Sequence, residues 1–157
     1  MIKRQALALG FSFCGVAPAD FLQEEAPRLE QWLRQGYQGE MHYLEKWFDK
    51  RLDPRKLLPG TKSVISLMHN YYTEKLPQDE DAPRVARYTY GKDYHRVLRR
   101  KLQALLDFIR EQVGEVQGRG FTDSAPILER AWAARAGLGW IGRNGMLIRR
   151  KQGGFFF

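Results

Sequence analysis

The most regular pattern of apolar positions lies in the second half of the chain. Apolar side chains recur there at spacings of three or four residues, which predicts one long amphipathic helix over residues 93–113. The stripe consists of Tyr94, Leu98, Leu102, Leu105, Ile109 and Val113. We expect this stripe to face the core and the basic residues between its members to face solvent.

Shorter patterns predict the remaining elements. The apolar run over residues 63–68 is the clearest strand, and residues 11–16 form a second one. Further helices are predicted over 2–9, 28–35, 40–50 and 126–135, and further strands over 118–123 and 146–150. Residues 74–83 are acidic, contain two prolines and show no periodicity, so we expect a surface loop there. Helices mixed with a few separated strands favour a single α+β or α/β domain over residues 1–157.

The charge of the chain is concentrated in its second half. The 157 residues carry a formal charge of +8, made up of 26 basic and 18 acidic side chains. Residues 1–83 hold 11 basic and 12 acidic residues, whereas residues 84–157 hold 15 and 6, a difference of +9. This asymmetry indicates either an anionic partner, such as nucleic acid or phosphate, or a solvated basic surface, and composition alone does not choose between them.

Composition also excludes several classes of protein. Cys14 is the single cysteine, so the chain has neither a disulfide framework nor the ligands for a cysteine-held zinc or iron–sulfur site. We find no apolar run long enough for a membrane span and no secretory leader, and we therefore expect a cytoplasmic protein. The three phenylalanines at residues 155–157 predict an exposed apolar end that a further segment or a partner covers.

The segment Gly137-Leu138-Gly139-Trp140-Ile141-Gly142 matches the dinucleotide-binding pattern G-x-G-x-x-G. That motif requires a strand before the glycines and a helix after them, and the predicted order here is the reverse. We therefore reject a dinucleotide site. Two interpretations remain open: a tight connection between helix and strand, or a backbone that approaches a ligand closely.

Two other patterns attract attention but point to no specific chemistry. His42, His69 and His95 lack metal-ligand spacing among themselves or with Cys14. Basic and tyrosine residues alternate over residues 84–94, which predicts a strand with one basic and one aromatic face. Such a strand suits a phosphate or a planar ligand, although composition alone favours a half-buried strand with solvated arginines.

Asp123 is the carboxylate with the greatest potential for chemistry. It precedes the helix predicted at Pro126, so the first interpretation is a residue at a helix N-terminus, stabilised as an anion by the helix dipole. A role as a proton donor would require burial against an apolar ligand to outweigh that dipole.

Several ordered segments together resemble the epoxyqueuosine reductase family. Three of them lie in the second half: Arg87-Tyr88 with Gly91-Lys92-Asp93-Tyr94-His95, then Asp123-Ser124-Ala125-Pro126-Ile127-Leu128-Glu129-Arg130, then Ala136-Gly137-Leu138-Gly139-Trp140-Ile141-Gly142-Arg143-Asn144. Earlier segments fit in the same order, namely Gly39-Glu40-Met41-His42-Tyr43, Arg51-Leu52-Asp53-Pro54 and Pro59-Gly60-Thr61-Lys62-Ser63-Val64-Ile65. The resemblance covers essentially the whole chain.

This resemblance implies an oxidoreductase of tRNA modification. The implied reaction reduces epoxyqueuosine to queuosine at the wobble position, with electrons delivered through cobalamin and a proton from Asp123. The implied fold is an α/β sandwich, a nitroreductase-like cobalamin-binding domain with helices on a small mixed sheet, and it spans residues 1–157. In the family, two [4Fe–4S] clusters in a following ferredoxin-like domain supply the electrons, and this chain has no ligands for them.

The resemblance also implies site residues and partners. The expected partners are the tRNA anticodon stem-loop that carries epoxyqueuosine and an electron donor, and no membrane. The implied cofactor-binding residues are Arg51, Ala86, Arg87, His95, Arg130, Gly142, Arg143, Asn144, Met146 and Leu147. The implied RNA-binding residues are Arg96, Arg99, Arg100 and Lys101.

Two residues depart from the family pattern: Arg143 replaces the usual lysine, and Gly145 replaces a small hydroxyl residue. The first change keeps the positive charge, whereas the second removes any hydroxyl contact at that position. We expect the chain to bind cofactor without sustaining turnover alone. The alternatives are a non-catalytic cobalamin- or RNA-binding module and an inactive truncated fragment.

Overall fold

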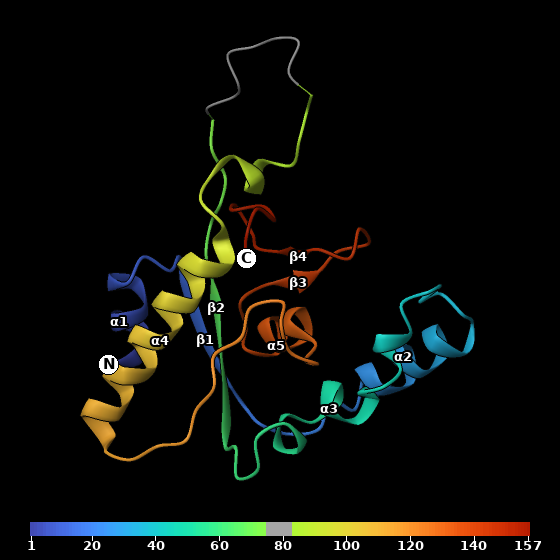
Figure 1. Ribbon diagram of the computed structural model, residues 1–157, viewed down its shortest axis with the longest axis horizontal. Coiled ribbons are helices and arrows are strands. Elements are labelled where there is room, and N and C mark those ends of the chain that lie inside the picture. The colour runs from blue at the N-terminus through green and yellow to red at the C-terminus, as the bar shows by residue number, and fades with distance from the viewer. Residues whose placement is uncertain (75–82) are drawn as a thin grey trace.

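A two-stranded antiparallel ribbon runs through the middle of the molecule, in a computed structural model that describes residues 1–74 and 83–157 (Figure 1). The ribbon pairs β1 (Phe13–Pro18) with β2 (Ser63–Met68), so that Phe13 lies opposite Met68. A second antiparallel pair is the hairpin of β3 (Trp140–Ile141) and β4 (Leu147–Ile148). The α+β class is confirmed, but the expected mixed sheet is wrong, because both described sheets are antiparallel.

Those helices that are defined in the sequence by an apolar stripe or a terminal glycine lie close to their predicted positions. They are α1 (Ile2–Ala8), α2 (Glu25–Arg34), α3 (Phe48–Leu52), α4 (Tyr94–Val113) and α5 (Glu129–Arg135), with short 3-10 helices at η1 (His42–Leu44), η2 (Pro54–Lys56) and η3 (Arg87–Tyr90). The helix predicted over residues 40–50 is divided into η1 and α3. The predicted helix over 93–113 is confirmed as α4.

The central ribbon has helices on both faces, as Figure 1 shows for α1 and α4 on one side and α5 on the other. Alternation along the strands produces this arrangement, because successive side chains point to opposite faces. Cys14 and Leu67 join the cluster built on α1 and α4, whereas Ala17 and Met68 join the clusters that include α5. Both faces of the ribbon are therefore packed, one against α1 and α4 and the other against α5.

Gly15 allows β1 to lie directly against the end of α5. A side-chain Cβ at this position would lie 2.5 Å from the carbonyl oxygen of Ala136 and 2.8 Å from its Cβ. Ala136 ends α5 and leads into the glycine-rich segment before β3. The close approach at Gly15 thus fixes where the β3–β4 hairpin leaves the core.

The apolar stripe of α4 packs as predicted except at its last member. Leu98 and Leu105 are buried against Ala6 and Phe11, and the stripe residues between Tyr94 and Ile109 join the same cluster. Val113 is 61% exposed because the helix ends there, beyond α1.

Three predicted elements are wrong. Residues 118–123 form no strand, because this segment runs back along α4, where a Cβ at Gly118 would meet Leu106 at 2.6 Å. The basic and tyrosine residues of 84–94 form no strand either, since η3 turns the backbone there. Helix α5 begins at Glu129 rather than at Pro126.

The three terminal phenylalanines pair with the segment that follows β2, so the end of the chain is not unpaired, although part of its apolar surface is exposed as expected. The backbone of Phe157 exchanges two hydrogen bonds of 3.0 Å with His69, just beyond β2. The Phe157 ring stacks on Tyr94 with 4.0 Å between centroids and an angle of 9°. These contacts continue the central ribbon and join it to the start of α4. Phe155 is still 41% exposed.

The loop predicted over residues 74–83 lies almost wholly outside the described residues. Within the part of the chain that the structure describes, no helix has the length and apolar character needed to cross a membrane.

Candidate active site

Asp123 lies on the irregular segment between α4 and α5 and has an unusual backbone. Its φ is 54°, a left-handed value that among the described non-glycine residues only Lys151 shares. Such a conformation costs on the order of 1–3 kcal/mol and persists where neighbouring contacts enforce it. Because α5 begins six residues later, Asp123 is not at a helix N-terminus, and the expected dipole stabilisation is wrong.

Two hydrogen bonds hold Asp123, one from each of the flanking helices. The Tyr94 hydroxyl, at the start of α4, donates to Asp123 Oδ2 over 2.7 Å. The Asp123 backbone N–H donates to Glu129 Oε1, at the start of α5, over 3.1 Å. The two helices thus fix both the carboxylate and the backbone of this residue, which explains how the strained conformation is maintained.

Burial and neighbouring charge shift the titration of both partners. Burial raises the pKa of Tyr94 well above its ordinary value, and the hydrogen bond to Asp123 raises it further. Tyr94 therefore remains a protonated donor at neutral pH. Desolvation also raises the pKa of Glu129; the hydrogen bond from the Asp123 N–H opposes this shift, and the negative charge of Asp123 adds to it. Glu129 is nevertheless an exposed residue.

A cavity of ≈ 540 Å³ opens beside Tyr94. Aromatic and basic side chains dominate its wall, which includes His69, Tyr71, Arg87, Tyr88, Tyr90, Lys92, Tyr94 and Phe157. The ring of Tyr94 lies between its stacking partners Phe157 and His95, each at 4.0 Å between centroids. Tyr94 thus connects the acid at Asp123 to a space with aromatic surfaces and positive charge.

The β3–β4 hairpin brings together half of the cofactor-binding residues that the resemblance implied. Gly142, Arg143, Asn144, Met146 and Leu147 belong to it, and Arg130 of α5 donates to the carbonyl of Gly145 in its turn. Three apolar side chains remain outward-facing on the hairpin: Trp140, Ile141 and Met146 are 51%, 47% and 38% exposed. The hairpin therefore presents apolar surface close to arginine side chains.

The glycines of the hairpin serve its own packing. A Cβ at Gly139 would collide with the backbone of Ile148, and one at Gly142 would lie 2.5 Å from Ile148 Cδ1. The close contacts at Gly139 and Gly142 favour the first of the two interpretations of this glycine-rich segment, a tight connection between helix and strand. At Gly142, an implied cofactor contact, the space of a side chain is already filled by Ile148 and Asn144.

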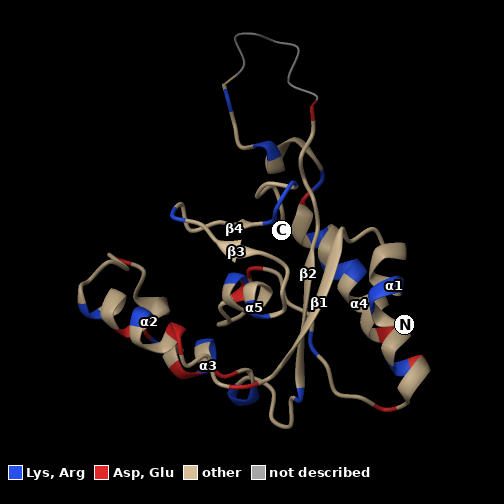
Figure 2. Ribbon diagram, turned by 180° about the vertical axis from the view of Figure 1, so that it is seen from behind, with Lys and Arg blue, Asp and Glu red and all other residues tan. Residues whose placement is uncertain are grey.

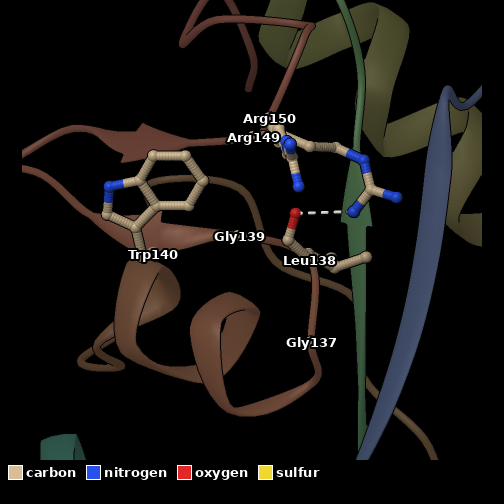
Figure 3. Close-up of a pocket in the computed structure, with 6 residues that line it drawn as sticks. All are labelled: Gly137, Leu138, Gly139, Trp140, Arg149 and Arg150. Carbon is tan, nitrogen blue, oxygen red and sulfur yellow. Dashed lines mark hydrogen bonds between the residues drawn. The ribbon is translucent and has the colours of Figure 1, made fainter.

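A second hollow, of ≈ 320 Å³, lies where the chain passes from α5 into β3 (Figure 3). Arg149 reaches across it and donates to the Leu138 carbonyl over 2.7 Å, while its guanidinium lies 4.0 Å from the Phe13 ring centroid. The Trp140 indole points away from that hydrogen bond in Figure 3. Arg149 therefore ties the hairpin to the central ribbon and is not free to bind a ligand.

The other implied cofactor residues are in different surroundings. Arg51 is 8% exposed on α3 and donates to the carbonyls of Tyr43 and Leu44, which stabilises η1. These hydrogen bonds of Arg51 therefore join α3 to η1, and none of them involves Asp123 or its two partners.

Arg87 lines the cavity beside Tyr94, where it donates to the Thr73 carbonyl and lies 4.8 Å from the Tyr72 ring centroid. Ala86 precedes it and accepts hydrogen bonds from Thr89. His95 is joined to the cavity only through its stacking on Tyr94, and its Nδ1 lies 3.0 Å from Asp93 Oδ1.

The implied RNA-binding residues lie on α4, where Figure 2 shows basic segments along the helix. Arg96, Arg99 and Arg100 are exposed. Lys101 differs, because its Nζ donates to the Gly10 carbonyl over 3.3 Å and lies above the Phe11 ring. Arg96 lies 3.8 Å from Asp93 Oδ2, and Arg100 donates to the Arg96 carbonyl over 3.3 Å. All three arginines are still exposed and can contact an anionic partner, whereas Lys101 joins α4 to the end of α1.

Two partners of Asp123 were not predicted from the sequence. Tyr94 was assigned to an apolar stripe and Glu129 received no role, although both flank the acid in space. Tyr94 is 29 residues from Asp123, and no local spacing indicates that contact. Glu129 lies six residues after Asp123, and only the absence of a helix over residues 126–128 allows its side chain to reach back. Among the described residues, no group of three or more histidine, cysteine or acidic side chains is arranged to hold a metal ion.

Comparison with known proteins identifies the family. Residues 51–124 match the family model described as epoxyqueuosine reductase QueG, DUF1730. An epoxyqueuosine reductase from Leadbetterella byssophila is 56% identical over 156 residues, which are 99% of this chain and 51% of that protein.

Two solved structures show the same fold. One is an epoxyqueuosine reductase with an epoxyqueuosine-modified tRNA-Tyr stem-loop, with a TM-score of 0.84 and 29% identity over 99% of this chain and 42% of that one. The other, from Bacillus subtilis, has its catalytic aspartate loop swung out of the active site; its TM-score is 0.83 and its identity 28%, over 99% and 42% of the two chains. The chain belongs to the epoxyqueuosine reductase family and spans about half the length of the curated relatives it matches.

Proposed function

We propose that this chain forms the part of an epoxyqueuosine reductase that binds the modified nucleoside and supplies a proton to it. The reaction is the reduction of epoxyqueuosine to queuosine at the wobble position of tRNA. The observation that carries this proposal is the hydrogen bond between Asp123 and Tyr94, because Tyr94 lines a cavity of ≈ 540 Å³ with aromatic and basic walls. A planar nucleobase fits aromatic surfaces, and the basic side chains suit the adjoining phosphates.

The relatives support this assignment. One related structure contains a tRNA stem-loop with epoxyqueuosine, and another has a catalytic loop that carries an aspartate. We infer that the segment around Asp123 is the corresponding loop in this chain. Its irregular backbone, with positive φ at Asp123, is consistent with a segment whose position depends on a few contacts.

Asp123 would act as a general acid at the departing epoxide oxygen. The Tyr94 hydroxyl occupies Oδ2, which leaves Oδ1 to carry the proton that is transferred. A proton supplied at that point avoids the expulsion of a bare alkoxide, and such positioned acids contribute about 10²–10⁴-fold to rates. The stacked pair of Tyr94 and Phe157 would hold the base or its ring substituent against the cavity wall.

Cobalamin is the proposed cofactor, and the β3–β4 hairpin fits such a group. The exposed side chains of Trp140, Ile141 and Met146 suit the broad apolar face of a corrin, and Arg143 suits its polar rim. When bound, the reduced corrinoid supplies the two electrons of the reaction. Iron–sulfur clusters would need ligands from outside this chain, which has one cysteine.

The exposed arginines of α4 are the proposed contacts with the anticodon stem-loop. Arg96, Arg99 and Arg100 lie on the helix that begins with Tyr94, so a phosphate backbone along α4 would lead into the cavity. Phosphate contacts of this kind position an RNA without reading its sequence.

The test is turnover of an epoxyqueuosine-containing stem-loop by the chain supplied with cobalamin and a strong chemical reductant under anaerobic conditions. We expect queuosine to form, and we expect Asp123→Asn to reduce its rate by about 10²-fold or more. Asp107→Asn, an exposed change on α4, is the matched control and should leave the rate unchanged. RNA binding without turnover in the wild type would instead favour a non-catalytic RNA-binding module, and equal rates for the wild type and Asp123→Asn would remove the assigned acid.

A further inference from the structure

The wall of the cavity beside Tyr94 contains basic side chains that differ in what they can bind. Among the described residues that line this cavity, three are basic, namely His69, Arg87 and Lys92, and none is acidic. A ligand in this space therefore meets positive charge without a competing carboxylate in the wall. How strongly an anion is attracted depends on which of the three side chains is both ionised and free.

Two of these side chains have little to offer an anion. Burial lowers the pKa of His69, and the positive charge of Lys101 lowers it further, so the imidazole is uncharged at neutral pH. Arg87 is charged, but its guanidinium donates to the Thr73 carbonyl and lies 4.8 Å from the Tyr72 ring centroid. The side chain of Arg87 thus ties η3 to the segment that follows β2.

Lys92 is the cation of this wall that is not engaged. Within the part of the chain that the structure describes, its ammonium group has neither a hydrogen bond nor an ion pair. The acid next to it in the sequence has other partners, because Asp93 accepts the His95 N–H and lies 3.8 Å from the Arg96 Nε. Lys92 is exposed and lines the cavity at the same time, which places it at the rim.

The backbone around Lys92 is held on both sides. Lys92 lies on the short connection over residues 91–93, between η3 and α4. Arg87 anchors the start of η3, and Asp93 caps the first turn of α4 through its bond to the His95 N–H. The rim position is therefore fixed, while the ammonium group moves on its flexible stem.

A nucleotide in an RNA strand matches both features of this cavity. Its base presents flat faces to the aromatic wall, and its phosphates, which are joined to the base through the ribose, carry a full negative charge. With the base inside the cavity, a phosphate would lie toward solvent, where Lys92 is. A free nucleoside would offer the same base but would leave Lys92 without a partner.

We propose that Lys92 binds a phosphate adjoining the modified nucleoside, so that the cavity selects a nucleotide within an RNA strand over the free nucleoside. This inference rests on the proposed function for the identity of the base, and it names the residue that contacts the backbone at that base. The contact is independent of sequence, because an ammonium group neutralises a phosphate as a point charge. It is also separate from the arginines of α4, which would contact phosphates farther along the RNA.

Three variants isolate the charge at this position. Lys92→Met removes the ammonium group and keeps an unbranched side chain, whereas Lys92→Arg keeps the positive charge. Lys46→Met is the matched control, because it changes the net charge by the same amount. Lys46 is an exposed lysine between η1 and α3, and within the described chain it has no hydrogen bond or ion pair.

The first measurement is the affinity for a fluorescently labelled stem-loop that carries epoxyqueuosine, followed by anisotropy over a series of salt concentrations. Lys92→Met should bind about tenfold more weakly than the wild type. The slope of the logarithm of its binding constant against log salt concentration should become shallower by about 1. Lys92→Arg and Lys46→Met should match the wild type. Equal losses for Lys92→Met and Lys46→Met would overturn the phosphate contact.

The second measurement replaces the two phosphates that flank the modified nucleoside, one at a time, by a neutral methylphosphonate. We expect one replacement to weaken binding to the wild type by about tenfold and to have no further effect on Lys92→Met, because both changes remove the same contact. If neither replacement weakened binding to the wild type, or if each weakened binding to both proteins equally, the proposal would be refuted.

Turnover under the conditions of the preceding test separates this inference from the function on which it rests. We expect Lys92→Met to raise KM for the stem-loop and to leave kcat unchanged. The free epoxyqueuosine nucleoside should be converted equally slowly by the wild type and Lys92→Met, and slower conversion by Lys92→Met would contradict a role at the phosphate. Absence of turnover with the methylphosphonate effect intact would refute the proposed function and leave the phosphate contact established. Failure of the stem-loop to bind the wild type would overturn both.

Discussion

Replacement of Gly15 by alanine tests how the hairpin is joined to the core. The new Cβ would lie 2.5 Å from the Ala136 carbonyl oxygen, whereas ordinary contacts begin at 3.4 Å, so β1 and the end of α5 must separate by 3.4 − 2.5 = 0.9 Å. Neither the carbonyl oxygen nor the Cβ of Ala136 can rotate away. Leu138 Cγ, at 3.0 Å, blocks a sideways shift.

The expected loss of stability follows from two opposing effects. Overpacking of a close-packed core costs about 1–3 kcal/mol. We expect a cost in the upper part of that range, because the new Cβ would meet a backbone atom that cannot move aside easily. Alanine also restricts the unfolded chain, which returns about 0.4–1 kcal/mol. We therefore expect Gly15→Ala to lower the free energy of unfolding by about 1–2.5 kcal/mol.

The assay is urea unfolding followed by tryptophan fluorescence, with Gly91→Ala as the matched control. Gly91 has a φ of −104°, and a Cβ added to it would have no neighbouring atom within 4 Å. Its replacement should therefore leave the free energy of unfolding unchanged or raise it slightly. If Gly15→Ala were as stable as Gly91→Ala, the close contact between β1 and α5 would be refuted.

Two further predictions concern charge. Hydrogen bonds from Arg55 hold the pKa of Asp53 below its usual range, so the stabilisation by Asp53 is present above its unfolded-state pKa of about 3.9 and is lost as the pH falls through its lower folded-state pKa. Asp53→Asn should therefore flatten the fall of melting temperature in acid, and an unchanged slope would contradict this role. On α4, Arg99→Glu combined with Arg100→Glu should weaken the binding of an RNA stem-loop. The slope of the logarithm of the binding constant against log salt concentration should become shallower by roughly 1–2. Arg28→Glu on α2 should change neither the affinity for RNA nor its salt dependence. If both variants lost affinity equally, the effect would come from net charge and not from a binding surface on α4.

Sequence patterns predicted the parts of the fold that periodicity determines. The helix over 93–113 and the strand over 63–68 were confirmed, because a stripe of apolar residues and a continuous apolar run specify how each is buried. Residues 118–123 were wrongly predicted as a strand, since an extended segment can lie on a helix as readily as in a sheet. Here the space left by Gly118 and Gly120 accommodates Leu106 and Leu102 of α4.

The candidate site was less accessible to pattern analysis. Asp123 was identified through resemblance, whereas spacing alone placed it at a helix N-terminus that the structure does not contain. Its contact with Tyr94 joins two segments that are 29 residues apart, and the fold alone brings them together. The cavity depends in addition on Phe157, whose position follows from pairing with His69 beyond β2. No local pattern encodes such long-range contacts.

The proposed function requires that the chain bind a corrinoid on the β3–β4 hairpin, and an anaerobic titration with cob(II)alamin tests this binding. The visible spectrum should show a saturable shift for the wild type, while circular dichroism confirms that the chain is folded. Asp123→Asn should show the same shift, because it changes the acid and not the hairpin that holds the cofactor. Absence of a shift from the folded wild type would contradict corrinoid binding and leave RNA binding by α4 as the leading function of the chain.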